Sequence, residues 1–222
     1  MRAEDRVGNR VTNVRFDSGF HEHAKIWGQR MTKDFTALPL SEVVAEFSTM
    51  AAVTVSVFGL LDERQLNWRP AATSWSVAQC FDHLLTSNRE MFQAIDTSLD
   101  GSHPRTVWQR LPILPRVLGS MLIKSQAPET KRKFTAPRKA EPAWSTIDPR
   151  IIERFVVSQH EAAVRVASID RRDMAGTIMI SPFVSFIAYS VIDGCRLIVT
   201  HQRRHFEQAR RVTQEPGFPA HG

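Results

Sequence analysis

Apolar residues recur at three- and four-residue spacing in four segments of the chain, which is the pattern of helices that bury one face. The predicted helices span approximately residues 41–62, 76–99, 146 or 148 to 168, and 185–211. No segment shows a convincing alternation of apolar and polar residues over the length of a strand. Four amphipathic helices without strands favour an all-α fold, and we predict a four-helix bundle.

Capping signals stand at the starts of the first two predicted helices. Ser41 can accept a hydrogen bond from a free backbone amide, and Glu42 follows in the first turn, where the helix dipole favours an acid. Ser76 and Gln79 have the spacing of a capping box. Capping residues therefore explain why both predicted helices begin where they do.

The segments outside the helices differ in character. Residues 1–37 show no periodicity, so we expect a poorly ordered N-terminal extension, then the bundle over 38–214 and a C-terminal tail over 215–222. Residues 100–145 contain six prolines and form a long insert between the second and third helices. Within it, the apolar stretch 111–123 predicts a short helix after Pro115, and a loop of this length is typical of a functional lid or of disorder.

Composition narrows the class of protein. The chain has 222 residues, of which 42% are hydrophobic and 23% charged, as in an ordinary soluble protein with one main domain. Its two cysteines provide no disulfide framework and no CxxC motif, which fits a reducing compartment. The first 30 residues lack the apolar core of a secretory signal, and no uncharged stretch reaches the roughly 18–20 residues of a membrane span. We expect a soluble cytoplasmic protein with no membrane partner.

Positive charge is concentrated in the insert. The net charge is +6, and between residues 105 and 139 nine Lys and Arg face a single acid, Glu129. Such a cluster can bind nucleic acid electrostatically, although a basic loop is more often only solvated. We therefore keep nucleic acid only as an alternative partner.

A histidine pair lies on the fourth predicted helix. His201 and His205 are four residues apart, so a helix places them one turn apart on the same face, where two imidazoles can bind one metal ion at about 2.0–2.1 Å. The same spacing also arises by chance. The residues that we place on this inward face are Gly194, Leu197, Ile198, His201, His205 and Gln208. The residues that we place on the solvent side are Arg203, Arg204, Glu207 and Arg210. The glycine indicates either open volume or close helix packing.

The second predicted helix offers further candidates. His83 is a third possible ligand, and Glu90 lies seven residues later on the same face. Glu90 could accept a hydrogen bond from a ligand, bind the metal, act as a general base, or simply face solvent. Cys80 and Cys195 turn away from the neighbouring histidines, and we interpret them as small buried hydrophobes.

Short motifs follow one another in a fixed order along the chain. They are Leu66-Asn67-Trp68-Arg69-Pro70, then Trp75-Ser76-Val77-Ala78-Gln79, then His83-Leu84, and finally His201, His205 and Gln208. This order resembles the DinB-like superfamily, to which the YfiT-type proteins also belong. In that family a Trp-Ser pair opens the second helix, a His-Leu pair supplies the first metal ligand, and the last helix carries HxxxH, often followed by glutamine. The resemblance covers about residues 40–213, and the extension and the insert depart from it.

The resemblance implies a four-helix bundle in which His83, His201 and His205 hold a divalent Zn, Ni or Fe ion. Three nitrogen ligands leave at least one position for water or substrate, and a metal-bound water or thiol loses its proton more easily than a free one. The implied function is a metal-dependent hydrolase, or a transferase that uses a low-molecular-weight thiol, acting on a small molecule. Glu90 is the catalytic candidate.

A second hypothesis comes from a different class of protein. It is a non-catalytic helical bundle with a structural metal or none, whose basic insert binds nucleic acid or an acidic protein.

The chain contains no Gly-rich phosphate loop and no GxSxG elbow, which argues against phosphoryl transfer and serine hydrolysis. A homodimer is the commonest assembly for bundles of this kind.

Overall fold

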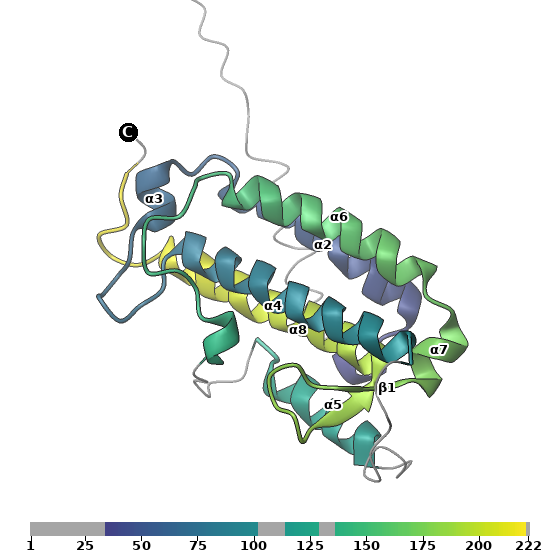
Figure 1. Cartoon of the computed structure of the whole chain (residues 1–222). Coiled ribbons are helices and arrows are strands. Elements are labelled where there is room, and N and C mark those ends of the chain that lie inside the picture. Colours follow the sequence, from purple (N-terminus) through teal and green to yellow (C-terminus); the bar gives the residue numbers. More distant parts are fainter. Residues whose placement is uncertain (1–33, 102–113, 129–135, 221–222) are drawn as a thin grey trace, which may run out of the picture. The chain divides into compact units, whose positions relative to one another are not determined.

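The computed structural model describes residues 34–101, 114–128 and 136–220 (Figure 1). The chain divides into residues 1–33, which lie outside the described part, and a second unit that begins at Asp34. The elements of the second unit are, in order, η1 (Phe35–Ala37), α2 (Leu40–Phe58), α3 (Glu63–Asn67), α4 (Val77–Leu99), α5 (Leu114–Ser125), η3 (Arg138–Ala140), α6 (Ile151–Ser168), α7 (Arg171–Gly176), β1 (Ile178–Ile180), β2 (Ala188–Ser190) and α8 (Val191–Val212).

The four long helices α2, α4, α6 and α8 form a bundle in which α2 and α4 each pack against both α6 and α8 (Figure 1). One phenylalanine from each helix meets in the core. Phe58 of α2 packs against Phe81 of α4 and Phe206 of α8, each pair with ring centroids 5.2 Å apart. Phe81 also packs against Phe155 of α6 at 4.9 Å. Buried aromatic rings contribute large apolar areas, so these contacts tie the four helices together, and the predicted all-α bundle is confirmed.

The first predicted helix ends earlier in the structure, and a short second helix follows it. α2 ends at Phe58, and α3 begins after Asp62, whose side chain and that of Gln65 form a capping box. The prediction of one helix through Asp62 is wrong because Leu60 and Leu61 continue the apolar spacing and hide the new helix start. A capping box satisfies two free amides locally and therefore outweighs the apolar pattern here.

The start of α4 is confirmed. Ser76 caps the helix, and Gln79 completes the capping box. The Gln79 Nε2 atom also donates to the carbonyl oxygen of Ala143 at 2.9 Å, and the Asp82 carboxylate accepts from the amide of Ala143 at 3.0 Å. These two bonds hold the end of the insert against α4.

The short helix predicted in the insert is α5. The hairpin of β1 and β2 was not predicted, since strands of three residues are too short to show an alternating pattern. Because of this hairpin, α8 begins at Val191 rather than near residue 185. Ser190 caps the helix by accepting a hydrogen bond from the amide of Asp193.

Gly194 lies where α8 meets the hairpin. A Cβ atom at this position would stand 2.6 Å from the Sδ atom of Met179, which is fully buried. Of the two interpretations left open for this glycine, close packing is therefore the one that the structure supports.

Most of the circumference of α8 is buried. Arg203 is 0% exposed and forms an ion pair with Glu46 of α2, at 2.9 Å from Nε and 2.6 Å from a terminal nitrogen to the same carboxylate oxygen. Glu207 is buried as well. The prediction that these two residues face solvent is wrong because α2, α4 and α5 all pack against α8 and cover more than one of its faces.

Both ends of the described chain pack onto the bundle. Phe35 and Leu38 belong to the hydrophobic core, so the described residues 34–37 of the predicted extension are part of the folded unit. Near the other end, Pro219 accepts a hydrogen bond from Gln65 at 3.0 Å, and Phe218 packs against Trp68. The bundle therefore extends slightly beyond both predicted boundaries.

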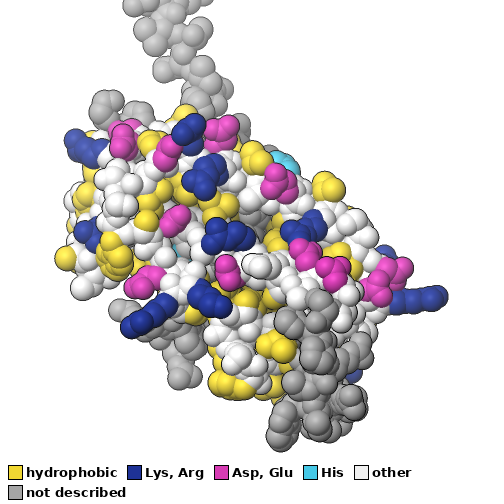
Figure 2. All heavy atoms as spheres, in the orientation of Figure 1, with side chains coloured by type: hydrophobic (Ala, Val, Ile, Leu, Met, Phe, Trp, Pro, Cys, Tyr) yellow, Lys and Arg dark blue, Asp and Glu magenta, His cyan; other side chains and the backbone are white. Residues whose placement is uncertain are grey.

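Among the described residues, one helix, α2, is long and apolar enough to cross a membrane by length and composition alone. The core helix of a soluble protein meets the same criterion, and α2 buries Val43, Phe47 and Met50 inside the bundle. On the face drawn in Figure 2, basic and acidic side chains are interspersed among apolar ones.

Candidate metal centre

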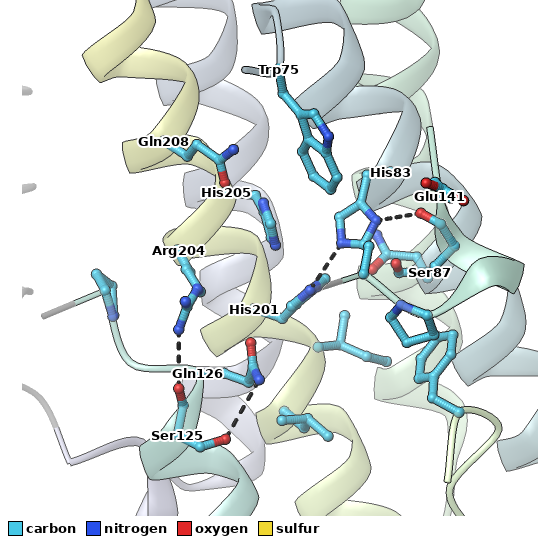
Figure 3. Close-up of a pocket in the computed structure, with 18 of the residues that line it drawn as sticks. Trp75, His83, Ser87, Ser125, Gln126, Glu141, His201, Arg204, His205 and Gln208 are labelled. Atoms are coloured by element: carbon cyan, nitrogen blue, oxygen red, sulfur yellow. Dashed lines mark hydrogen bonds between the residues drawn. The ribbon is translucent and has the colours of Figure 1, made fainter. Parts of the chain in front are cut away.

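Three histidines from two helices converge on one point. His83 comes from α4, and His201 and His205 come from α8, and the side chains point toward one another (Figure 3). One ligand atom from each lies within 4.8 Å of the others. The Nε2 atoms of His83 and His201 are 3.2 Å apart. The sequence-predicted ligand set is thus brought together by the packing of α4 against α8.

The orientation of His83 is fixed by the insert. Its Nδ1 atom lies 2.5 Å from the carbonyl oxygen of Ala140. A carbonyl only accepts, so Nδ1 carries the proton, and the lone pair of the neutral ring is on Nε2. That lone pair points toward His201. A carbonyl that fixes the tautomer in this way is the usual partner of a metal-binding histidine.

Trp75, the residue before the N-cap of α4, covers two of the histidines. Its ring stacks on His205 at a centroid distance of 5.7 Å and lies 5.0 Å from His83 in a tilted arrangement. The indole therefore keeps water from one side of both imidazoles. It also limits the ring orientations that they can adopt.

The donor set fits a transition-metal ion. Ligand nitrogens at about 2.0–2.1 Å from a tetrahedral ion stand about 3.3 Å apart, close to the separation of the His83 and His201 Nε2 atoms. The Nδ1 atom of His205 is buried and has no hydrogen-bond partner among the described residues. A buried nitrogen without a partner is costly, and a metal ion bound at that nitrogen would relieve the cost. His83, His201 and His205 are therefore the residues that could hold the ion.

Burial keeps the three imidazoles neutral. It lowers the pKa of His83, and the hydrogen bond to Ala140 only partly opposes this effect. Burial lowers the pKa of His201 well below its ordinary value, and the repulsion that a proton on His201 would meet from a protonated His83 and from Arg204 lowers it further. The pKa of His205 is lowered similarly, mainly by burial. Neutral imidazole is the form that binds metal, so the site is in its binding form at neutral pH.

A sequence model of the DinB superfamily matches residues 46–209, which is most of the chain and includes all three histidines. The chain belongs to the DinB superfamily. Comparisons with curated proteins and with solved structures found no significant match. The family resemblance inferred from the order of the motifs is therefore confirmed.

In this DinB-superfamily chain the histidines form part of the wall of a cavity of about 1270 Å³. Pockets that bind small molecules are usually about 300–1,000 Å³, so the cavity has room for a small molecule beside the three histidines. The described part of the insert forms one side of it, from Leu122 to Pro128 and from Ala136 to Trp144. Polar residues of the wall include Ser87, Asn88, Glu141, Arg204, Gln208, Arg211 and Glu215.

Glu90 lies elsewhere. It is not among the described residues that line the cavity, and its carboxylate is 3.7 Å from the guanidinium of Arg89. Seven residues along a helix correspond to a rise of about 10 Å, which carries Glu90 past the site even though it shares a face with His83. A catalytic role for Glu90 stays a prediction from the sequence.

Two residues of the wall were missed by sequence reasoning. Ser87 lies one turn after His83, and its buried hydroxyl has no hydrogen-bond partner among the described residues. The four-residue spacing from His83 could have identified it. Glu141 follows the carbonyl that binds His83 (Figure 3). It had no local signal, because only the path of the insert brings it to the site.

The two cysteines are not part of the site. Cys80 and Cys195 are fully buried, and burial raises the pKa of each thiol to about 12. Since the thiolate is the reactive form, neither side chain is a nucleophile or a metal ligand here. This agrees with their interpretation as small buried hydrophobes.

Proposed function

We propose that this protein is a metal-dependent enzyme that acts on a small molecule, either as a hydrolase or as a transferase that uses a low-molecular-weight thiol. The observation that carries the proposal is the convergence of three neutral histidines on the wall of a large cavity. Three histidines with an open side are typical of catalytic rather than structural metal sites. Zn, Ni and Fe all suit imidazole ligands.

The chain's own residues would prepare the site in three ways. The Ala140 carbonyl keeps the proton of His83 on Nδ1 and leaves Nε2 as a donor. Burial holds all three imidazoles in the neutral form. Trp75 excludes water from one side, so that an incoming molecule approaches from the cavity. When bound, a divalent ion lowers the pKa of a coordinated water or thiol, which supplies the nucleophile for either reaction.

Glu141 is the acid best placed to accept a proton. It lines the cavity on the same side as His83, next to the residue that orients that histidine (Figure 3). A carboxylate within reach of the reacting group is the usual general base of metal-dependent hydrolases. We therefore assign proton transfer to Glu141 ahead of Glu90.

The thiol of a transferase would have to come from a cosubstrate. Both cysteines of the chain are buried and have thiol pKa values of about 12. The cavity is large enough for a thiol and an electrophile together. This supports small-molecule thiols as test compounds.

The first experiment measures bound metal in protein purified without a histidine tag. We expect about one equivalent of metal in the wild type and in His160→Gln, whose exposed histidine on α6 lies outside the cluster. We expect none in His201→Gln. A ligand at 1,000 times its dissociation constant adds about 4.1 kcal/mol of stability. Adding Zn, Ni or Fe to the wild type and to His160→Gln after a chelator has removed their metal should therefore raise the melting temperature of each by roughly 8–16 °C.

The outcome decides between the two hypotheses. If the wild type neither carries metal nor is stabilised by added metal, the proposal fails. If it does carry metal, thiols paired with electrophiles, and amide and ester substrates, are the compounds to screen next. Glu141→Gln should then lose activity while it retains metal.

Nothing in the part of the chain that the structure describes favours the alternative, a nucleic-acid-binding bundle. Of the basic residues that suggested it, five lie outside the described part of the chain: Arg105, Arg110, Lys131, Arg132 and Lys133. On the face shown in Figure 2, described charges of both signs are interspersed. A steep dependence of DNA or RNA binding on salt concentration would support this alternative.

A further inference from the structure

Arg204 lies beside the metal centre and faces the cavity. It directly precedes His205 on α8, and it lines the same cavity as the three histidines. A terminal nitrogen of Arg204 donates to the carbonyl oxygen of Ser125 at 3.0 Å. This bond fixes the direction of the guanidinium along the cavity wall (Figure 3).

A second arginine lines the same wall. Arg211 lies two helical turns after Arg204 on the same side of α8, and it lines the same cavity. Two like charges in one partly buried wall repel each other, and a bound anion would relieve that repulsion. Gln208 lies between them in sequence and adds an amide with two N–H donors.

The charge of the described part of the wall favours an anionic ligand. Among the described residues, the acids that line the cavity are Glu141, on the side of His83, and Glu215, beyond the end of α8, and both are exposed. Formally these two acids balance the two arginines. The three histidines are neutral, so a divalent ion would leave the loaded cavity with a net charge of about +2. Charge of one sign in a cleft raises the local concentration of ligands of the opposite sign.

We propose that Arg204, assisted by Arg211 and Gln208, binds a carboxylate of the substrate or cosubstrate, while the reactive group of the same molecule reaches the histidine centre. The substrate class is therefore an anionic small molecule rather than a neutral one. This inference rests on the proposed function and adds a specificity determinant to it. A planar guanidinium matches a carboxylate through two parallel N–H···O bonds, which a single ammonium group cannot make.

The test uses pairs of thiols that differ only in charge. Metal-loaded protein is titrated calorimetrically with ω-mercaptocarboxylic acids of two to six carbons and with the ω-mercaptoalcohols of the same lengths. For at least one length, the wild type should bind the acid roughly tenfold or more tightly than the alcohol, the size expected of a charge-assisted hydrogen bond. The carbon number at which the affinity for the acid most exceeds that for the alcohol reports the distance from the metal to Arg204.

Matched variants assign the preference to one side chain. Arg204→Gln should lose the preference for the acid but bind the alcohol as before, and Arg204→Lys should keep part of it. Arg211→Gln should show a smaller loss. Arg210→Gln is the control, because Arg210 lies on the same helix but pairs with Glu207 and is not among the described lining residues.

The outcomes separate the two proposals. If the variants keep their metal but the wild type shows no preference at any length, the carboxylate subsite is wrong and the metal-dependent function stands. If Arg204→Gln weakens acid and alcohol equally, Arg204 only braces α5 against α8, and the subsite is also wrong. If the wild type binds no metal, the proposed function fails. The subsite is then supported only if metal-free wild type binds succinate and Arg204→Gln does not.

Discussion

The Nδ1 atom of His83 lies 2.5 Å from the carbonyl oxygen of Ala140, and this contact joins the histidine cluster to the segment that precedes α6. The segment 140–143, which we call the strap, is itself held on α4. Ala143 accepts a hydrogen bond from Gln79 and donates one to Asp82. The ring of His83 is therefore positioned by two residues that precede it in the same helix, Gln79 and Asp82, which act through the strap.

Loosening the strap should weaken metal binding although no ligand is changed. In Asp82→Ala the Ala143 amide loses its acceptor, so the Ala140 carbonyl is held less firmly against His83. Loss of such an outer partner typically costs 10–100-fold in affinity, and we expect about tenfold for this indirect contact. Competition with a chromophoric chelator measures the dissociation constant.

Two further variants separate the strap from other effects. Asp82→Asn keeps an acceptor oxygen and should lose less affinity than Asp82→Ala. Asp96→Ala removes an acid from the same helix that pairs with Arg165 instead, and it should bind metal like the wild type. Equal affinity in Asp82→Ala and the wild type would show that the strap does not position His83.

The metal-free protein should lose stability as the pH falls below about 6.5. The unfolded chain has ordinary histidines that take up protons near this pH, whereas the buried histidines have lowered pKa values and do not. The unfolded state then binds more protons, so the free energy of unfolding decreases with falling pH until the folded-state pKa values are reached. Each histidine contributes up to about 1.4 kcal/mol per pH unit. Urea unfolding in the presence of a chelator at pH 7.5, 6.5 and 5.5 measures the slope.

The same titration in His205→Gln tests the cause. The variant should show a shallower dependence of stability on pH between 6.5 and 5.5, and His160→Gln should match the wild type. An identical slope in His205→Gln would mean that other groups are responsible for the acid sensitivity.

The buried pair of Glu46 and Arg203 should be sensitive to the loss of either partner. Arg203→Ala or Glu46→Ala leaves one charge in the core between α2 and α8, which typically costs about 3–5 kcal/mol. The double substitution Glu46→Leu with Arg203→Met removes both charges and should be much closer to the wild type. Chemical denaturation checks the prediction, and additive losses in the double variant would contradict it.

The cysteines should be unreactive in the folded protein. Burial raises both thiol pKa values to about 12, so little thiolate forms and no reagent reaches it. With Ellman's reagent at pH 8, native protein should give no thiol within minutes, and unfolded protein should give two equivalents. Rapid reaction of the native protein would reopen Cys80 or Cys195 as a nucleophile.

Helix positions and the histidine pair could be predicted well because both depend on local periodicity. The 3.6-residue repeat places His201 and His205 on one face, and the capping box of Ser76 and Gln79 fixes the start of α4. The prediction was wrong at the end of α2 and at the start of α8. At the end of α2, apolar residues conceal the signal that ends the helix. Before α8, the strands of the hairpin have only three residues each and show no pattern.

The sequence by itself therefore determined the bundle and two of the candidate ligands, and the order of its motifs supplied the third. Only the tertiary structure decided what surrounds them. The carbonyl of Ala140 carries no side-chain signature, Glu141 reaches the cavity through the path of the insert, and Arg203 is buried because α2 brings Glu46 to it. The contact of His83 with Ala140 joins residues 57 positions apart, and that of Glu46 with Arg203 joins residues 157 positions apart. Such contacts leave no repeating pattern in the sequence, because they depend on how the helices pack rather than on how each helix forms.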